Sequence, residues 1–195
     1  MFDVWYNRLL KIPGLKFDLG MTDTDSFLFK VNNENLLLSK INDIMDYSNY
    51  PPTHPNFSNE KKAKLGCFKD ELGGTVRCKE FIGLRSKCYA LKLEDKTGSK
   101  KFDKKVCKGI GRIAVQNRLR FQDYKKCLFQ SKIVKKTFHS IRSQKHVLKT
   151  VLIQKRALSF TDTKRWLFEC GIHSVPYGSR LIKIFNEVCP RCPFT

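Results

Sequence analysis

The sequence predicts an α+β protein: an antiparallel β-hairpin near the N-terminus, followed by a longer and strongly basic region of mixed helices and strands. Apolar and polar residues alternate with period 2 on both sides of a polar break at 21–26, a pattern typical of a hairpin. Apolar residues recur at helical spacing over 2–10 and 36–47. Over 106–155, β-branched runs are mixed with many Lys and Arg residues.

The length and composition bound the class of protein. A chain of 195 residues suggests one ordinary domain or pieces of two. No apolar run approaches the ~20 residues that a membrane span needs, and the N-terminus lacks the basic-then-apolar layout of a signal peptide. We therefore expect a soluble intracellular protein with no membrane partner, in either the nucleus or the cytoplasm.

The net charge of +20 is unevenly distributed. Residues 1–60 hold 5 Lys and Arg against 8 Asp and Glu, whereas residues 61–195 hold 33 against 10. An acidic end followed by a long basic surface favours a phosphate backbone as the partner. The alternatives are a solvated basic face and an anionic membrane, and the chain has no clean basic amphipathic helix for the latter.

The predicted hairpin at 15–31 follows a helix at 2–10, which Ile12-Pro13-Gly14 ends. Its tip would present Asp23 and Asp25 together. Paired carboxylates suit hard divalent cations such as Mg²⁺, and two such ions can clamp the attacking and leaving oxygens of a phosphoryl transfer. The alternative is a solvated turn, because Asp and Thr are common turn residues.

A loop and a strand are expected between the hairpin and the basic region. After the helix at 36–47, residues 48–61 are rich in Pro, Asn and Ser, which predicts a loop and the main boundary of the chain. A strand is predicted at 81–91, with apolar even-numbered residues apart from Ser86, and with Arg85, Lys87 and Tyr89 on the opposite face. Two cations beside an aromatic ring suit a sugar-phosphate backbone, and a solvated strand face is the alternative.

The basic region carries weaker signals. Residues 92–105 predict a mobile Lys-rich loop, and a strand that is buried on both faces is expected at 147–153. Leu119 and Phe121 alternate with Arg residues, and the spacing that follows predicts a short helix around 124–128. Between 96 and 161 the acidic residues are Asp103 and Asp123 alone.

The 8 cysteines favour reduced thiols, because no secretory signal precedes them. Cys189-Pro190-Arg191-Cys192 is half of a zinc knuckle. A closed zinc site needs four ligands, usually from a second Cys-x-x-Cys pair, and the chain has none. Cys170 and His173 are the residues that could contribute in its place.

Several separated segments, in the right order, resemble family B DNA polymerases. Thr22-Asp23-Thr24-Asp25-Ser26 is similar to motif C, and Leu84-Arg85-Ser86-Lys87-Cys88-Tyr89 is similar to the Lys-x-Tyr motif of protein-primed members. Segments 65–71, 106–110, 121–124, 155–159, 162–165 and 176–178 resemble the palm–thumb junction, thumb and C-terminal end of viral and Maverick/Polinton transposon polymerases. The resemblance covers about residues 1–180.

The resemblance implies an organisation and a set of roles. Residues 1–47 would be the last part of a palm, 48–61 a loop, 62–95 the palm–thumb junction, and 96–195 a basic thumb with a tail. Asp25 would be the main ligand of Mg²⁺, with Asp23 beside it, and Thr24 and Ser26 would shape the turn. The primer-template duplex would be held by Arg85, Lys87, Tyr89 and Lys108.

The departures from the family pattern imply an incomplete enzyme. Motif A, motif B and the 3′–5′ exonuclease motifs are absent. The expected function is therefore that of a fragment of a DNA-directed DNA polymerase, inactive alone, whose complete form would use two Mg²⁺ ions, a dNTP and a DNA duplex. The alternatives are a non-catalytic DNA-binding remnant of a transposon or viral gene, and one half of a split polymerase. Further partners would be the missing N-terminal part and a terminal protein primer.

Overall fold

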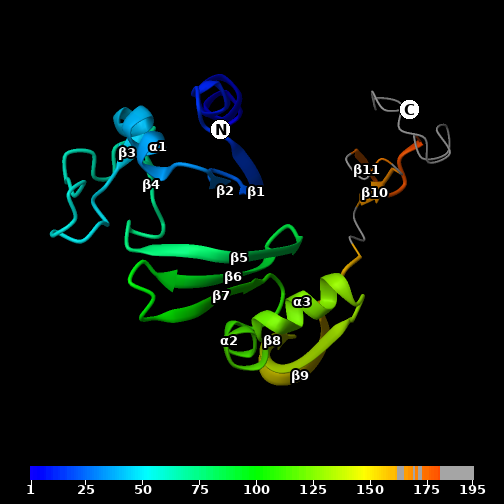
Figure 1. The fold of residues 1–195 in the computed structure, drawn as a ribbon. Coiled ribbons are helices and arrows are strands. Elements are labelled where there is room, and N and C mark those ends of the chain that lie inside the picture. Colours follow the sequence, from blue (N-terminus) through cyan, green and yellow to red (C-terminus); the bar gives the residue numbers. More distant parts are fainter. Residues whose placement is uncertain (162–164, 169, 171–172, 181–195) are drawn as a thin grey trace.

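The computed structural model describes residues 1–161, 165–168, 170 and 173–180. It confirms a mixed α+β architecture with antiparallel hairpins, in which an N-terminal unit lies above a three-stranded sheet with helices and a long ribbon below (Figure 1). None of the helices among these residues is long and apolar enough to cross a membrane.

The N-terminal unit is a hairpin covered by a short helix. A π-helical turn at Val4–Arg8 and a 3₁₀ turn at Leu9–Lys11 precede β1 (Phe17–Asp23) and β2 (Ser26–Val31), which pair antiparallel as the alternation predicts. The indole of Trp5 is buried against three rings of the hairpin, with centroids 5.4–5.8 Å away: Phe17, Phe27 and Phe29. This aromatic cluster fixes the hairpin, and hence the turn at 24–25, on the unit's core.

The helix predicted at 36–47 is shorter and begins earlier. α1 spans Glu34–Ile41, because the side chain of Asn33 accepts the Leu36 N–H at 3.0 Å and caps the first turn. A 3₁₀ turn follows at Asn42–Ile44, and β3 (Met45–Asp46) then pairs parallel with β4 (Phe68–Lys69). No helix or strand lies between β3 and β4, so the loop predicted at 48–61 is confirmed.

Two aspartates organise the loop between β3 and the central sheet. The buried carboxylate of Asp46 accepts the N–H groups of Ser48 at 2.8 Å and Ala63 at 3.2 Å, and pairs with Lys69 at 3.2 Å. The Asp70 carboxylate accepts the Tyr50 hydroxyl at 3.0 Å and two backbone N–H groups, including that of Gly74. Together with the buried rings of Tyr47 and Tyr50, these bonds hold the loop in place.

The central sheet differs from the sequence prediction. The segment 81–91 is a hairpin rather than one strand: β5 (Val76–Arg85) turns at Ser86-Lys87 into β6 (Cys88–Asp95). The predicted mobile loop at 92–105 is mostly strand, because β6 continues to Asp95 and β7 (Lys101–Cys107) completes the order β5-β6-β7. Three of the Lys residues that suggested a loop, Lys101, Lys104 and Lys105, lie on the edge strand β7, where charged side chains discourage further pairing.

Two helices close the core beneath this sheet. α2 (Arg112–Arg118) and α3 (Phe121–Phe129) bury Leu119, Phe121, Tyr124 and Cys127, with 0–2% exposure, against the sheet and the root of the ribbon. The helix expected around 124–128 is confirmed within α3. The alternation at 118–121 is not a strand: it marks the junction of α2 and α3, where the Asp123 carboxylate accepts the Arg120 N–H at 2.8 Å.

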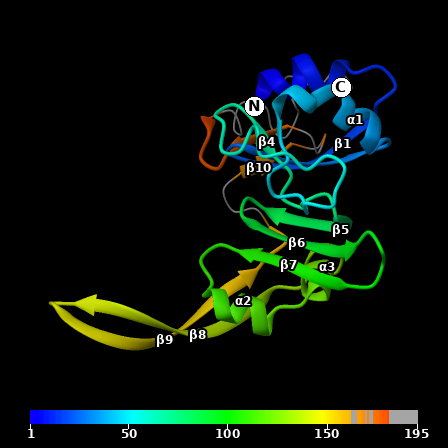
Figure 2. The same ribbon diagram turned by 90° about the vertical axis from the view of Figure 1, so that its left-hand side faces the viewer.

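A two-stranded ribbon leaves the core. β8 (Val134–Gln144) and β9 (Val147–Leu158) pair antiparallel and project far from the rest of the chain (Figure 2). The strand predicted at 147–153 is confirmed, but its burial on both faces is wrong: Leu148 is 74% exposed and Leu152 65% exposed, because no second layer covers the ribbon. The small hairpin of β10 (Arg165–Leu167) and β11 (Ser174–Pro176) follows.

Candidate nucleic-acid and metal site

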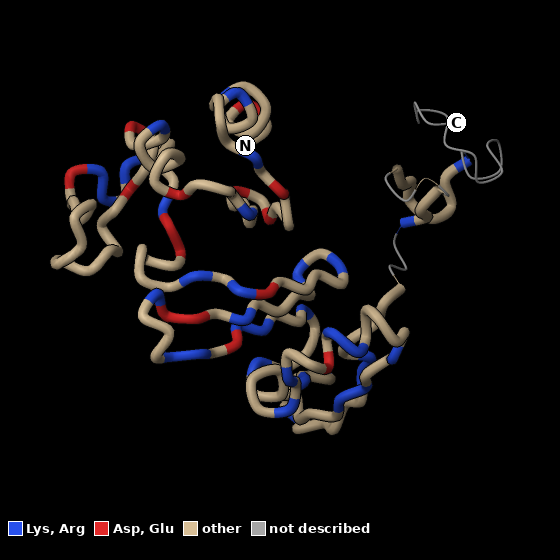
Figure 3. Tube along the Cα trace, viewed as in Figure 1, with Lys and Arg blue, Asp and Glu red and all other residues tan. Residues whose placement is uncertain are grey.

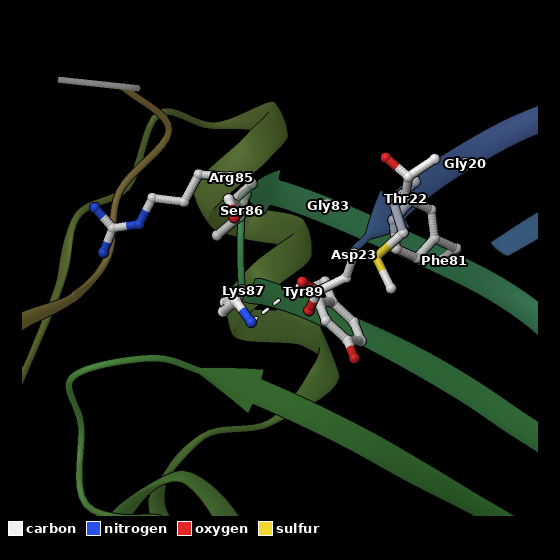
Figure 4. A pocket seen from close by; sticks show the side chains of 11 residues that line it. Gly20, Thr22, Asp23, Phe81, Gly83, Arg85, Ser86, Lys87 and Tyr89 are labelled. Carbon is white, nitrogen blue, oxygen red and sulfur yellow. Dashed lines mark ion pairs between the residues drawn. The ribbon is translucent and has the colours of Figure 1, made fainter. Parts of the chain in front are cut away.

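A cleft of about 370 Å³ lies where two hairpins from distant parts of the chain meet. One wall is the end of β1, including Thr22 and Asp23, and the other is the turn between β5 and β6 with the start of β6, including Lys87 and Tyr89 (Figure 4). The structure thus brings together residues from the two segments that resemble motif C and the Lys-x-Tyr motif.

The hairpins are joined by an aromatic ring set between two glycines. A Cβ on Gly83 would come within 2.9 Å of the Phe81 ring, and a Cβ on Gly20 within 3.4 Å of the same ring. Gly20 on β1 therefore permits the close approach of β1 and β5, whereas Gly83 leaves room for the Phe81 ring on its own strand. Sequence reasoning missed these three residues, although a glycine inside each strand was the available signal.

The turn at Thr24-Asp25 sets the position of the carboxylates. Asp23 pairs with Ser26 at the end of the ladder, and Thr24 adopts a left-handed conformation with φ 58°. The Thr24 hydroxyl donates to Asp23 Oδ1 at 3.3 Å, and the Ser26 hydroxyl donates to the Asp23 carbonyl at 3.0 Å. Asp23 consequently faces the cleft, while Asp25 lies exposed at the tip.

Asp23 already has a cationic partner. Lys87 Nζ lies 3.1 Å from Asp23 Oδ1, and both side chains are partly exposed, at 43% and 33% (Figure 4). Lys87 sits in the tight turn with φ 56°, and its carbonyl accepts the Lys108 N–H at 2.9 Å. The backbone of Lys108 therefore supports the turn at Lys87. Lys108 itself lines a second groove, beside β7 and α2.

Tyr89 lines the cleft near Asp23. Its ring packs against that of Phe81, with centroids 6.3 Å apart. Burial and the nearby charges of Asp23 and Glu71 raise the pKa of the Tyr89 hydroxyl, and Lys87 partly offsets this rise. The hydroxyl therefore remains protonated near neutral pH and can donate a hydrogen bond to an anion.

Arg85 does not join this group. It belongs to the lining of the cleft, but its guanidinium extends away from Asp23 and Lys87 (Figure 4). The shared face that a single strand would give Arg85, Lys87 and Tyr89 is absent, since a turn separates Arg85 from Cys88. Only Lys87 and Tyr89, among these three, have side chains placed beside Asp23.

The donor set fits one Mg²⁺ ion in part. Asp23 and Asp25 offer carboxylate oxygens, and Mg²⁺ is commonly held by one or two carboxylates together with substrate phosphates. Within the part of the chain that the structure describes, no three Asp, Glu, His or Cys side chains gather into a metal-binding group. Cys189 and Cys192, the half zinc knuckle, lie outside the described residues.

Apart from Lys87, most Lys and Arg residues lie away from the turn that carries Asp23 and Asp25. Lys and Arg residues follow β7, the α2–α3 region and the ribbon, while most acidic residues lie in the upper half of the molecule (Figure 3). On the ribbon, cations face each other across the two strands: Lys135 and Arg156, Lys136 and Lys155, and Arg142 and Lys149. Like charges directly opposite destabilise a ribbon, so this arrangement favours an anionic partner.

Comparisons with family models, with curated proteins and with solved structures each find no match for this chain. The resemblance to family B DNA polymerases therefore depends on the quoted sequence segments.

Proposed function

We propose that this chain supplies one side of the metal site and the primer grip of a DNA-directed DNA polymerase, and that it is inactive alone. The observation that carries the proposal is the meeting of Asp23, Lys87 and Tyr89 in one cleft. The two segments that resemble polymerase motifs are far apart in the sequence, and their side chains line the same cleft.

Each residue has a role that its chemistry permits. Asp25 and Asp23 would bind Mg²⁺, which supplies Lewis-acid stabilisation of phosphoryl transfer when bound. Lys87 would offer its ammonium to a primer phosphate, and the Tyr89 hydroxyl would offer a hydrogen-bond donor beside it. The isolated chain would be inactive because a second ion and a triphosphate require further carboxylates and cations to place them.

A photo-crosslinking experiment tests the primer grip. A duplex with a recessed 3′ end and a photoreactive group near that end is expected to label the 81–91 segment, and Lys87→Gln is expected to reduce the labelling. Arg85→Gln is the matched control, because it removes the same charge from a side chain whose guanidinium extends away from Asp23 and Lys87 (Figure 4). Equal labelling of both variants would contradict the proposed grip.

Primer extension tests the catalytic half of the proposal. With Mg²⁺ and dNTPs, the purified chain is expected to add no nucleotide. Addition of a polypeptide carrying motifs A and B would restore templated synthesis if the chain is half of a split enzyme, and Asp25→Ala would abolish it. Templated synthesis by the chain alone that Asp25→Ala abolishes would refute the expected inactivity.

A second candidate function is non-catalytic binding of duplex DNA, favoured by the ribbon. β8–β9 has no acidic residue and extends about 40 Å at 3.3 Å per residue. A two-stranded ribbon is narrow enough to enter a DNA groove, and such binding weakens steeply with salt. Affinity for duplex that is unchanged by both Asp25→Ala and Lys87→Gln would favour this function over the first.

A further inference from the structure

The second groove, of about 680 Å³, is lined mainly by the strand β7 and by α2, and it shares no lining residue with the cleft at Asp23. β7 is an outer strand of the three-stranded sheet, on the side of α2 (Figure 1). Among the described residues, the order β5-β6-β7 leaves one side of β7 without a partner strand. A strand edge of this kind is a template for pairing with another chain, and the groove gives that chain room to lie beside it.

The backbone of β7 presents hydrogen-bonding groups to its open side. The Lys108 N–H donates to the Lys87 carbonyl at 2.9 Å, in line with the β6–β7 register. At the other end of the strand, the Lys100 carbonyl accepts the Asp95 N–H at 2.9 Å. Because inward-facing residues alternate along an antiparallel pair, the even-numbered residues between them bond to β6. The N–H and C=O groups of the odd-numbered residues, such as Asp103, therefore face the open side.

The side chains of the groove carry an excess of positive charge. In the described part of the chain, its lining includes four cations and two carboxylates: Lys104, Lys105, Lys108 and Arg112, with Glu71 and Asp103. Lys105 donates to the carbonyls of Gln116 and Leu119, at 2.9 and 2.7 Å. The other three cations are exposed, and none forms an ion pair with a described carboxylate. Their charge is complementary to an acidic occupant.

The groove also has an apolar part. The ring of Phe102 is 48% exposed, and its face of the sheet is shared by Leu93, opposite it on β6, and by Val106, further along β7. β7 has 7 residues and is about 23 Å long at about 3.3 Å per residue. The groove therefore suits an extended segment of similar length that combines carboxylates with apolar side chains.

We propose that this groove binds an extended acidic peptide of a partner protein, which pairs with β7 as a further strand of the sheet. Backbone pairing would supply affinity, and carboxylates beside Lys104 and Arg112 would supply specificity. The Lys residues of β7 oppose pairing with a second copy of this basic chain and favour a strand of opposite charge. A nucleic acid matches the charge but has no alternating N–H and C=O groups to pair with a strand edge. The proposal does not rest on polymerase function, because the groove and the cleft at Asp23 are separate.

Binding of a synthetic peptide to the full chain tests the proposal. The probe is a labelled peptide of about ten residues in which Asp and Val alternate, and fluorescence anisotropy measures its dissociation constant. We expect saturable binding that weakens with salt, and no binding of a peptide in which Lys and Val alternate. Amide exchange at Asp103 should slow by about tenfold or more in the complex, whereas exchange at Lys104, which already bonds to β6, should change little.

Two results of this experiment would overturn the proposal. One is the absence of saturable binding, or binding that leaves amide exchange at Asp103 unchanged. The other is slower exchange at Asp103 with single-stranded DNA but not with the acidic peptide, which would assign the groove to nucleic acid.

Variants separate the contribution of charge from that of strand pairing. Lys104→Gln/Arg112→Gln is expected to weaken peptide binding about fivefold, and Lys11→Gln/Lys40→Gln, which removes two exposed cations from the N-terminal unit, should leave it unchanged. Asp103→Pro removes an outward-facing N–H and should abolish binding, because proline is tolerated at an edge but cannot donate. Asp103→Ala is its matched control, since it removes the same carboxylate and keeps the N–H.

Equal affinities of Asp103→Pro and Asp103→Ala would refute strand pairing. If Asp103→Pro fails to fold, the cation variants remain decisive: equal affinities of the groove variant and the unaltered chain would refute the role of charge complementarity.

Discussion

Neutralising one cation pair on the ribbon should lower the salt dependence of DNA binding by a calculable amount. Arg142 and Lys149 lie directly opposite each other on one face, in the exposed outer half of β8–β9. We consider the double variant Arg142→Gln/Lys149→Gln. Because the two cations repel across the ribbon, their removal should not destabilise the fold.

The magnitude follows from counterion release. Each phosphate contact contributes about −0.9 to the slope of log K against log salt concentration, so the loss of two contacts should make the slope shallower by about 1.8. When the salt concentration rises fourfold, both affinities should fall, and the factor by which the variant's affinity falls should be about 12 times smaller than that of the unaltered chain.

Fluorescence anisotropy of a labelled duplex, measured across a salt series, gives both slopes. Lys11→Gln/Lys40→Gln is the matched control, since it removes two exposed cations from the N-terminal unit instead of the ribbon. Its slope should equal that of the unaltered chain. Equal slopes for the ribbon variant and the unaltered chain would refute the assignment of the ribbon to phosphate contacts, as would an equal change in the control.

Three further predictions concern stability, each measured by unfolding. Burial opposes ionisation of Asp46, but its hydrogen bonds outweigh burial and hold the pKa of this carboxyl well below its usual range. The ionised carboxylate therefore contributes to the free energy of unfolding above about pH 4, and this contribution is lost as the pH falls toward the folded pKa. Asp46→Asn should make the melting temperature depend less on pH in the acid range. Gly74→Ala should destabilise the fold by about 1–3 kcal/mol more than Gly66→Ala. Both glycines have positive φ, but only at Gly74 would an added Cβ meet the Tyr50 ring, at 2.6 Å. Equal losses of unfolding free energy in the two variants would contradict this. Tyr124→Phe should cost about 1 kcal/mol, since the buried hydroxyl donates to a β7 carbonyl at 3.1 Å, and no loss would show that bond to be dispensable.

The sequence predicts well where a local pattern decides the structure. The hairpin β1–β2 follows from its alternation, because side chains of a strand point to opposite faces and only one face meets Trp5. The turn at Ser86-Lys87 escaped prediction, since neither residue is a usual hairpin-turn residue and Lys87 takes a positive φ without being Gly or Asn. Exposure of the ribbon escaped as well, because a run such as Val151-Leu152-Ile153 predicts burial whether or not a second layer exists.

The candidate site was predictable in its residues but not in its arrangement. Asp23, Lys87 and Tyr89 were identified from motif-like segments, yet their proximity depends on the packing of Phe81 between two hairpins. Non-local contacts of this kind leave no periodic trace in either segment. The same limit explains Arg85, whose assignment assumed one continuous strand.

Because Asp23 and Lys87 form an ion pair, binding of Mg²⁺ at Asp23 and binding of a phosphate at Lys87 would be coupled. An arriving cation must displace an ammonium from Asp23 Oδ1, and an arriving phosphate draws that same ammonium away. Binding of either ligand would therefore raise the affinity of the cleft for the other, by the same factor in both directions. We expect Mg²⁺ to bind weakly to the isolated chain and more tightly in the presence of duplex DNA, and equal affinities in a calorimetric titration would exclude this coupling.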